Sequence, residues 1–129
     1  MEIIKDIANS IHDMIEFTVD VPSNYADGKM PVLDMKVWMN DKSEIDFMFY
    51  EKPTKAQVVI SKDSALPHNI RMKTLTQEIF CRLHNTRSTV LQFYKVDILN
   101  DFMLKLKWSG YSESERLSIL QGGLNTYDK

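Results

Sequence analysis

The sequence predicts an α+β fold: an N-terminal helix, a small antiparallel sheet with a long hairpin, and then a three-helix bundle. Three observations predict this order. Isoleucines recur at helical spacing in residues 2–13, apolar and polar side chains alternate in residues 33–50, and a helical period returns in residues 67–124. The 129 residues fit a single domain, 1–129. We expect residues 1–60 to hold the first helix and the sheet, and residues 61–129 to form the helical subdomain.

The N-terminal region is expected to form a helix followed by a strand. Four isoleucines of the helix share one face: Ile3, Ile4, Ile7 and Ile11. Residues 15–21 alternate strictly between apolar and polar side chains, which predicts a half-buried strand. Residues 22–29 contain Pro22 and Gly28 and are expected to form a loop.

Two further alternating runs, residues 33–39 and 45–50, predict a β-hairpin whose loop lies at about residues 41–43. The register must place the apolar side chains of both strands on one face, because a slip of one residue would turn one set outward. The pairing that meets this condition joins Met35 to Phe49, Val37 to Phe47 and Met39 to Ile45.

The first helix of the bundle is predicted from Pro67 to about Thr86, because proline favours the first turn of a helix. A short apolar run at residues 58–60 precedes it and is expected to be an edge strand. Ser64 lies near the start of the helix as a candidate cap. The apolar face of this helix is expected to carry Ile70, Leu75, Ile79 and Leu83.

The second helix is predicted from about Val90 to Trp108, with Gly110 ending it. The third begins at Ser112, where Glu115 three residues later completes a capping box. Its inner face is expected to carry Leu117, Leu120 and Leu124.

Charge is unevenly distributed along the chain, although the net charge is only −2. Residues 1–51 carry 4 basic and 11 acidic side chains, whereas residues 52–95 carry 8 basic and 2 acidic ones. A local excess of cations attracts phosphates more than the net charge suggests. The same excess is also typical of a solvated helical face, so charge alone leaves both interpretations open.

The single cysteine, Cys81, excludes an internal disulfide. With no apparent signal peptide and no apolar run of membrane-spanning length, the expectation is an intracellular protein of cytoplasm or nucleus without a membrane partner. Cys81 is expected to be a small buried residue. Cys81 and His84 lack a second ligand pair for zinc, and no nucleophile, base or metal set converges in the sequence. No catalytic residue and no cofactor are therefore assigned to this chain.

The basic segment supplies the candidate binding residues. Lys52 and Lys55 leave the hairpin, and Arg71 and Arg82 are about three helical turns apart, so they are expected to share a face. Such a row would contact a phosphate backbone. Two outward hairpin residues, Trp38 and Tyr50, are expected to stack on a base or to pack against protein.

Four short motifs resemble, in order and spacing, the distal palm of retroelement reverse transcriptases, most nearly the Penelope-like type. They are residues 9–12 (Asn-Ser-Ile-His), 15–18 (Ile-Glu-Phe-Thr), 30–34 (Met-Pro-Val-Leu-Asp) and 49–54 (Phe-Tyr-Glu-Lys-Pro-Thr). The run from Pro67 to Thr86 resembles the start of the thumb in this group. Together the likeness spans residues 7–87.

The resemblance implies a primer-grip hairpin followed by thumb helices that hold a template–primer, an RNA–DNA or DNA duplex. The residues it assigns to nucleic-acid binding are Tyr50, Lys52, Thr54, Arg71, Lys73 and Arg82, and the basic segment adds Lys55 to these candidates. Two residues depart from the family pattern. Val32 occupies a position where the family usually has phenylalanine, and Glu51 occupies one where it usually has arginine. The Tyr-x-Asp-Asp motif that holds Mg²⁺ in the complete family enzyme is absent. The isolated chain is therefore not expected to act as an RNA-directed DNA polymerase.

Two functions remain open at this stage. The first is a reverse-transcriptase-derived palm–thumb module that binds template–primer through its basic middle segment. The second is an interaction module whose exposed hairpin residues meet protein, either another copy of the chain or the missing half of a polymerase.

Overall fold

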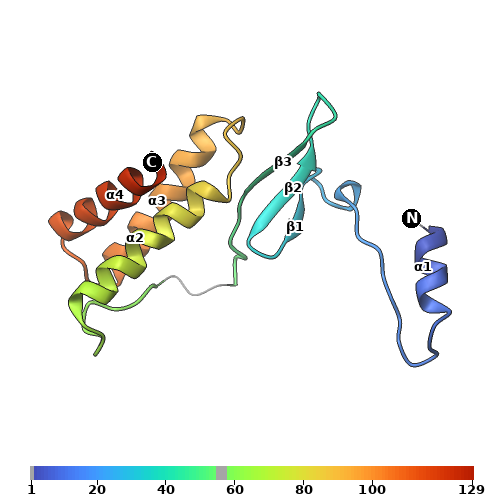
Figure 1. Ribbon diagram of the computed structural model, residues 1–129, viewed down its shortest axis with the longest axis horizontal. Helices are drawn as coiled ribbons and strands as arrows, with labels where there is room; N and C mark the ends of the chain where they lie inside the picture. The colour runs from blue at the N-terminus through green and yellow to red at the C-terminus, as the bar shows by residue number, and fades with distance from the viewer. Residues whose placement is uncertain (1, 55–57) are drawn as a thin grey trace. The chain divides into compact units, whose positions relative to one another are not determined.

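The computed structural model describes residues 2–54 and 58–129. Its elements run, in order, α1 (Glu2–Asn9), a 3₁₀ turn (Pro22–Asn24), β1 (Met30–Val32), β2 (Met35–Met39), β3 (Ile45–Phe49), α2 (His68–His84), α3 (Gln92–Trp108) and α4 (Glu113–Tyr127). The strands form one antiparallel sheet in the order β1-β2-β3 (Figure 1). The predicted α+β fold, with one helix, a small sheet and three further helices, is confirmed.

The chain separates into two compact units, residues 1–30 and residues 31–129. The hairpin and the three helices α2 to α4 thus belong to one unit, whereas the sequence suggested an internal boundary near residue 60.

The first unit contains α1 and a chain segment without a strand. The helix ends earlier than predicted, at Asn9. The Asn9 side chain makes two hydrogen bonds with the backbone of Phe17. Its Oδ1 accepts from the Phe17 N–H at 2.5 Å, and its Nδ2 donates to the Phe17 carbonyl at 3.2 Å. The prediction of a strand over residues 15–21 is wrong. An alternating run forms a stable strand only beside a partner, and these residues pair with no strand of the described structure.

The hairpin of the second unit has the predicted register, with Met35 opposite Phe49, Val37 opposite Phe47 and Met39 opposite Ile45. Its loop turns without glycine because Asn40 organises it. The Asn40 side chain accepts hydrogen bonds from the N–H groups of Lys42 and Glu44, both at 2.9 Å. Ser43 takes the left-handed conformation, with φ of 60°. This local network replaces the glycine that hairpin loops usually need.

The three helices of the bundle begin and end close to the predicted residues. Pro67 immediately precedes α2, and Gly110, with φ of 97°, follows α3. The capping box predicted at the start of α4 is present, with Ser112 and Glu115 bonding each other's backbone. Residues 58–60 form no strand. Instead the Val59 N–H donates to the Ser109 hydroxyl at 3.0 Å, which ties this segment to the end of α3.

The core of the second unit lies between α2, α3 and α4, which pack side by side (Figure 1). Its buried side chains include Leu75, Ile79 and Leu83 of α2, Phe102 and Leu106 of α3, Tyr111 just before α4, and Ile119 of α4. Burying several such side chains stabilises the bundle, each by ~1.5–3 kcal/mol relative to exposure.

A glycine pair allows α2 and α4 to approach closely. A Cβ built on Gly123 would lie 2.5 Å from Cγ2 of Ile79, and one on Gly122 would lie 3.2 Å from Cγ2 of Thr76. The glycine pair is thus a point of close contact between the two helices. The space that a side chain would occupy is filled by α2.

Three expectations about burial are wrong. Leu117 is 54% exposed, because Ile119 and Gly123 take the inner face of α4. Ile70 is 47% exposed at the outer side of α2. Cys81 is exposed rather than buried. The helices carry apolar residues on more than one side, so periodicity alone does not fix which side faces the core.

Candidate functional site

A buried ion cluster joins the end of the hairpin to the helical bundle. Glu51, two residues after β3, accepts hydrogen bonds from Arg82 of α2 at 2.8 Å and from Lys105 of α3. Only 4% of the Arg82 side chain and 6% of the Lys105 side chain are exposed. Arg82 also pairs with Glu78 at 2.5 Å, and its guanidinium lies 4.6 Å from the ring centre of Phe49. Glu51 is therefore an internal anchor of the hairpin.

This cluster corrects the role expected for Arg82. The sequence places it on an exposed face with Arg71, ready to contact a phosphate backbone, but the structure buries it between the hairpin and α3. Burying a cation is costly unless carboxylates compensate it. Glu51 and Glu78 supply that compensation, so the guanidinium is committed inside the protein.

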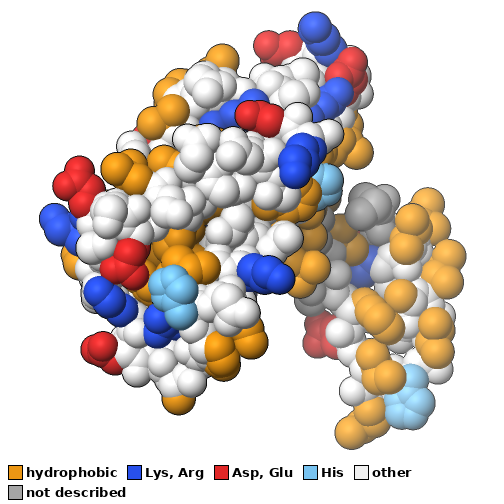
Figure 2. Space-filling model, turned by 60° about the vertical axis from the view of Figure 1, so that its left-hand side comes forward, with side chains coloured by type: hydrophobic (Ala, Val, Ile, Leu, Met, Phe, Trp, Pro, Cys, Tyr) orange, Lys and Arg blue, Asp and Glu red, His pale blue; other side chains and the backbone are white. Residues whose placement is uncertain are grey.

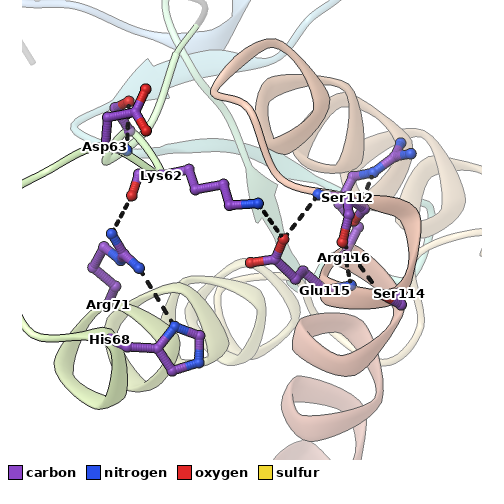
Figure 3. A network of polar contacts seen from close by, with 9 residues as sticks. Lys62, Asp63, His68, Arg71, Ser112, Ser114, Glu115 and Arg116 are labelled. Atoms are coloured by element: carbon purple, nitrogen blue, oxygen red, sulfur yellow. Dashed lines mark hydrogen bonds and ion pairs between the residues drawn. The ribbon is translucent and has the colours of Figure 1, made fainter.

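Arg71 is also buried, with 9% of the residue exposed. Figure 3 shows its guanidinium directed at the loop before α2, where Nη1 donates to the carbonyls of Lys62 and Ser64. Nη2 lies 3.4 Å from Nδ1 of His68. The expectation that Arg71 faces a duplex is therefore wrong. Its charge-assisted hydrogen bonds hold the loop against the first turn of α2.

Beside Arg71, an ion pair connects the same loop to α4. Lys62 Nζ lies 3.0 Å from a carboxylate oxygen of Glu115 (Figure 3). This ammonium, together with the hydrogen bonds to Ser112, lowers the pKa of Glu115 from 4.5 to about 2. Lys62 is thus another cation of the basic segment that pairs within the protein.

The remaining arginine of the segment, Arg87, covers the outer edge of β3. Its backbone N–H donates to the Phe47 carbonyl at 2.9 Å, and its guanidinium pairs with Glu44 at 2.8 Å and Asp46 at 3.0 Å. The hydrogen bond to Glu44 raises the pKa of Arg87 above its usual value. The Thr86 hydroxyl accepts from the Phe49 N–H at 3.0 Å. An edge that would otherwise be open for pairing is thereby closed.

Two cations expected at the interface remain exposed. Among the described residues, Lys52 and Lys73 have no ion-pair partner, and both are exposed. Lys55 lies outside the described residues. On the face shown in Figure 2, Lys and Arg side chains are dispersed, with Asp and Glu side chains among them. Among the described basic residues of segment 52–95, Lys62, Arg71, Arg82 and Arg87 are therefore engaged within the protein and do not join Lys52 and Lys73 in one phosphate-binding row.

The other two predicted site residues lie at the end of the hairpin. Thr54 is exposed, and Tyr50 is half-buried with the Lys36 ammonium 4.7 Å from its ring centre. This cation occupies one face of the Tyr50 ring, which leaves less aromatic surface for a base than the sequence suggests.

Two adjoining cavities form a groove between the hairpin end and α3. The first, of about 300 Å³, is lined by Tyr50 and by Tyr94, Asp97 and Asp101 of α3, among others. The second, of about 230 Å³, is lined by Glu51, Lys52, Pro53, Asp101, Leu104, Lys105 and Trp108. Glu51 and Asp101 border both cavities. The groove thus combines aromatic surface with both signs of charge, and it brings Lys52 next to a helix that the sequence did not connect to it.

The residues present do not fit the Mg²⁺ of a complete polymerase. The sequence lacks the Tyr-x-Asp-Asp motif, and the described residues contain no group of three or more His, Cys, Asp or Glu that could hold a metal ion. Within the described parts of the chain, no helix has both the length and the apolar character that crossing a membrane requires.

No protein-family model, no curated protein and no solved structure matches the chain.

Sequence reasoning missed the two residues that organise the site. Glu51 was seen only as a departure from the family pattern, and Lys105 only as part of a helix. The available signal was the charge segregation: an acidic hairpin region followed by a basic segment is also the pattern of two parts that pair with each other. Trp108, the exposed indole at the end of α3, carries no signal in the sequence beyond its place at the end of a predicted helix.

Proposed function

We propose that the chain is a reverse-transcriptase-derived palm–thumb module that is catalytically inactive alone and contacts nucleic acid with the end of its hairpin. The observation that carries the proposal is the Glu51 cluster. It fixes a hairpin of the expected register directly onto a three-helix bundle. A hairpin held against a helical bundle is the arrangement that the resemblance to palm and thumb implies.

The nucleic-acid contact in this proposal is smaller than the sequence suggested. Arg71 and Arg82 are occupied inside the protein, so the contact rests on Lys52, Thr54 and Tyr50 at the hairpin end and on Lys73 of α2. A contact with few cations gives weak binding with a shallow dependence on salt. It supports a role in positioning a strand within a larger assembly better than tight independent binding.

The test is the affinity for an RNA–DNA hybrid across a salt series from ~50 to ~200 mM, measured by fluorescence anisotropy. Lys52→Gln should weaken binding and make the salt slope shallower by about 0.9, the value for one phosphate contact. Lys42→Gln is the matched control, because it removes the same charge at the opposite end of the hairpin. Salt-insensitive binding, or equal effects of both variants, would contradict the proposal.

One observation favours a second function, a protein-interaction module. Residues 2–30 contain no buried side chain, and Ile3 and Ile11 of this region are each 75% exposed. On the other unit, α3 carries an outward apolar row of Phe93, Val96, Leu104 and Trp108, each 44–57% exposed. Surfaces of this kind are typical of protein contacts. Light scattering after size exclusion, without nucleic acid, separates the two functions, because a stable oligomer favours this one.

A further inference from the structure

We infer that the cavity between Lys52 and Trp108 is a stacking site for one unpaired base of a single-stranded nucleic acid. The inference rests on the proposed function and goes beyond it. The contact is made by α3 as well as by the hairpin, and it takes a single strand rather than a duplex.

The side chains that line the cavity suit a stacked base. Trp108 is 57% exposed and lines the cavity from α3, while Pro53 and Lys52 line it from the hairpin end. An exposed indole offers a flat π surface that stacks on any base, and the proline ring on the other side is apolar. The volume of about 230 Å³ is below the ~300–1,000 Å³ typical of small-molecule sites, so it suits one flat ring system.

The charges around the cavity decide how a nucleotide would lie in it. Lys105 and Glu51 neutralise each other, which leaves Lys52 as the cation available to a phosphate and Asp101 as an exposed carboxylate. Asp101 repels a phosphate but accepts hydrogen bonds from a base amino group or a ribose hydroxyl. The phosphate therefore belongs on the Lys52 side, and the base lies against Trp108.

A base pair inside a duplex cannot occupy this stacking site. A paired base is stacked on its neighbours and exposes no face to an indole, so the site requires an unpaired base. Because one cation contacts the strand, the salt slope for a single strand should be about −0.7. Most of the affinity must come from stacking.

The test uses the intrinsic fluorescence of Trp108. The sequence has two tryptophans, so a Trp38→Phe background leaves Trp108 as the single indole. We expect a single-stranded oligodeoxythymidine to quench this fluorescence. Measured by fluorescence anisotropy of a labelled strand, a readout that needs no indole, Trp108→Ala should weaken single-strand binding about tenfold, and Trp108→Phe should retain part of it. The matched control is Phe93→Ala, which removes another exposed aromatic side chain of α3 that does not line the groove.

An RNA–DNA hybrid titrated in parallel separates the two hypotheses. If the hybrid binds through Lys52 but the single strand neither binds nor quenches Trp108, the stacking site is refuted while the proposed function stands. If neither probe binds, both are refuted. If the protein forms an oligomer without nucleic acid that Trp108→Ala dissociates, the indole covers a protein contact and the inference is overturned. Circular dichroism of each variant confirms that the helices are intact.

Discussion

Neutralising Glu51 should destabilise the fold more than neutralising any exposed carboxylate. In Glu51→Gln, the carboxylate that compensates Arg82 and Lys105 becomes a neutral amide. Arg82 retains Glu78, but within the described residues Lys105 has no other ion-pair partner. Removing one member of a buried ion pair leaves an uncompensated charge and costs ~3–5 kcal/mol. Since the amide oxygen still accepts one hydrogen bond, we expect about 3 kcal/mol for this variant.

The assay is urea unfolding followed by circular dichroism, with the free energy of unfolding extrapolated to water. A domain of this size is stable by roughly 5–15 kcal/mol, so the variant should still fold. Glu78→Gln is the control, because it makes the same chemical change to a carboxylate that also contacts Arg82 but is 49% exposed. We expect it to cost about 0.2–1 kcal/mol. Equal costs for the two variants would refute the view that Glu51 anchors the hairpin.

Two further predictions concern the bundle. Gly123→Ala should lower the free energy of unfolding by ~1–3 kcal/mol, because the new Cβ would lie 2.5 Å from Ile79, whereas Gly122→Ala should cost less because its nearest atom is 3.2 Å away. Urea unfolding of both variants checks this difference, and a reversed order would contradict it. The Lys62–Glu115 pair should stabilise the protein above pH 4.5 and lose its effect as the pH falls towards 2, because the pKa of Glu115 is lowered on folding. The stability difference between the wild type and Lys62→Met, measured from pH 7 to pH 2, should therefore shrink over that interval, and a constant difference would argue against it.

Local patterns predicted most of the fold. The hairpin register followed from the requirement that apolar residues of both strands share a face, and the capping box fixed the start of α4. These features depend on neighbours in sequence. The prediction of a strand at residues 15–21 is wrong because a strand needs a partner strand distant in sequence, and a local pattern does not show whether that partner exists.

The candidate site was less predictable, because tertiary contacts determine whether a charged side chain is exposed or buried in an ion pair. Charge counting could not separate Lys52, which is exposed, from Arg82, which is buried thirty residues later in the same basic segment. The same limit applies to Trp108. Its place beside Lys52 depends on how α3 packs against the hairpin end, and no spacing in the sequence encodes that contact.

The charge segregation has a structural explanation that gives Glu51 a role within the fold. Three carboxylates of the acidic half, Glu44, Asp46 and Glu51, pair with Arg87 and Arg82 of the basic segment. The opposite charges therefore dock the hairpin onto the helices. A reversal of this charge, Glu51→Arg, would place three cations in a buried cluster that retains only the half-exposed Glu78 among its described carboxylates. The charge at position 51 must therefore be opposite to the charges of Arg82 and Lys105. In this chain these three charges stabilise the fold rather than contact a phosphate.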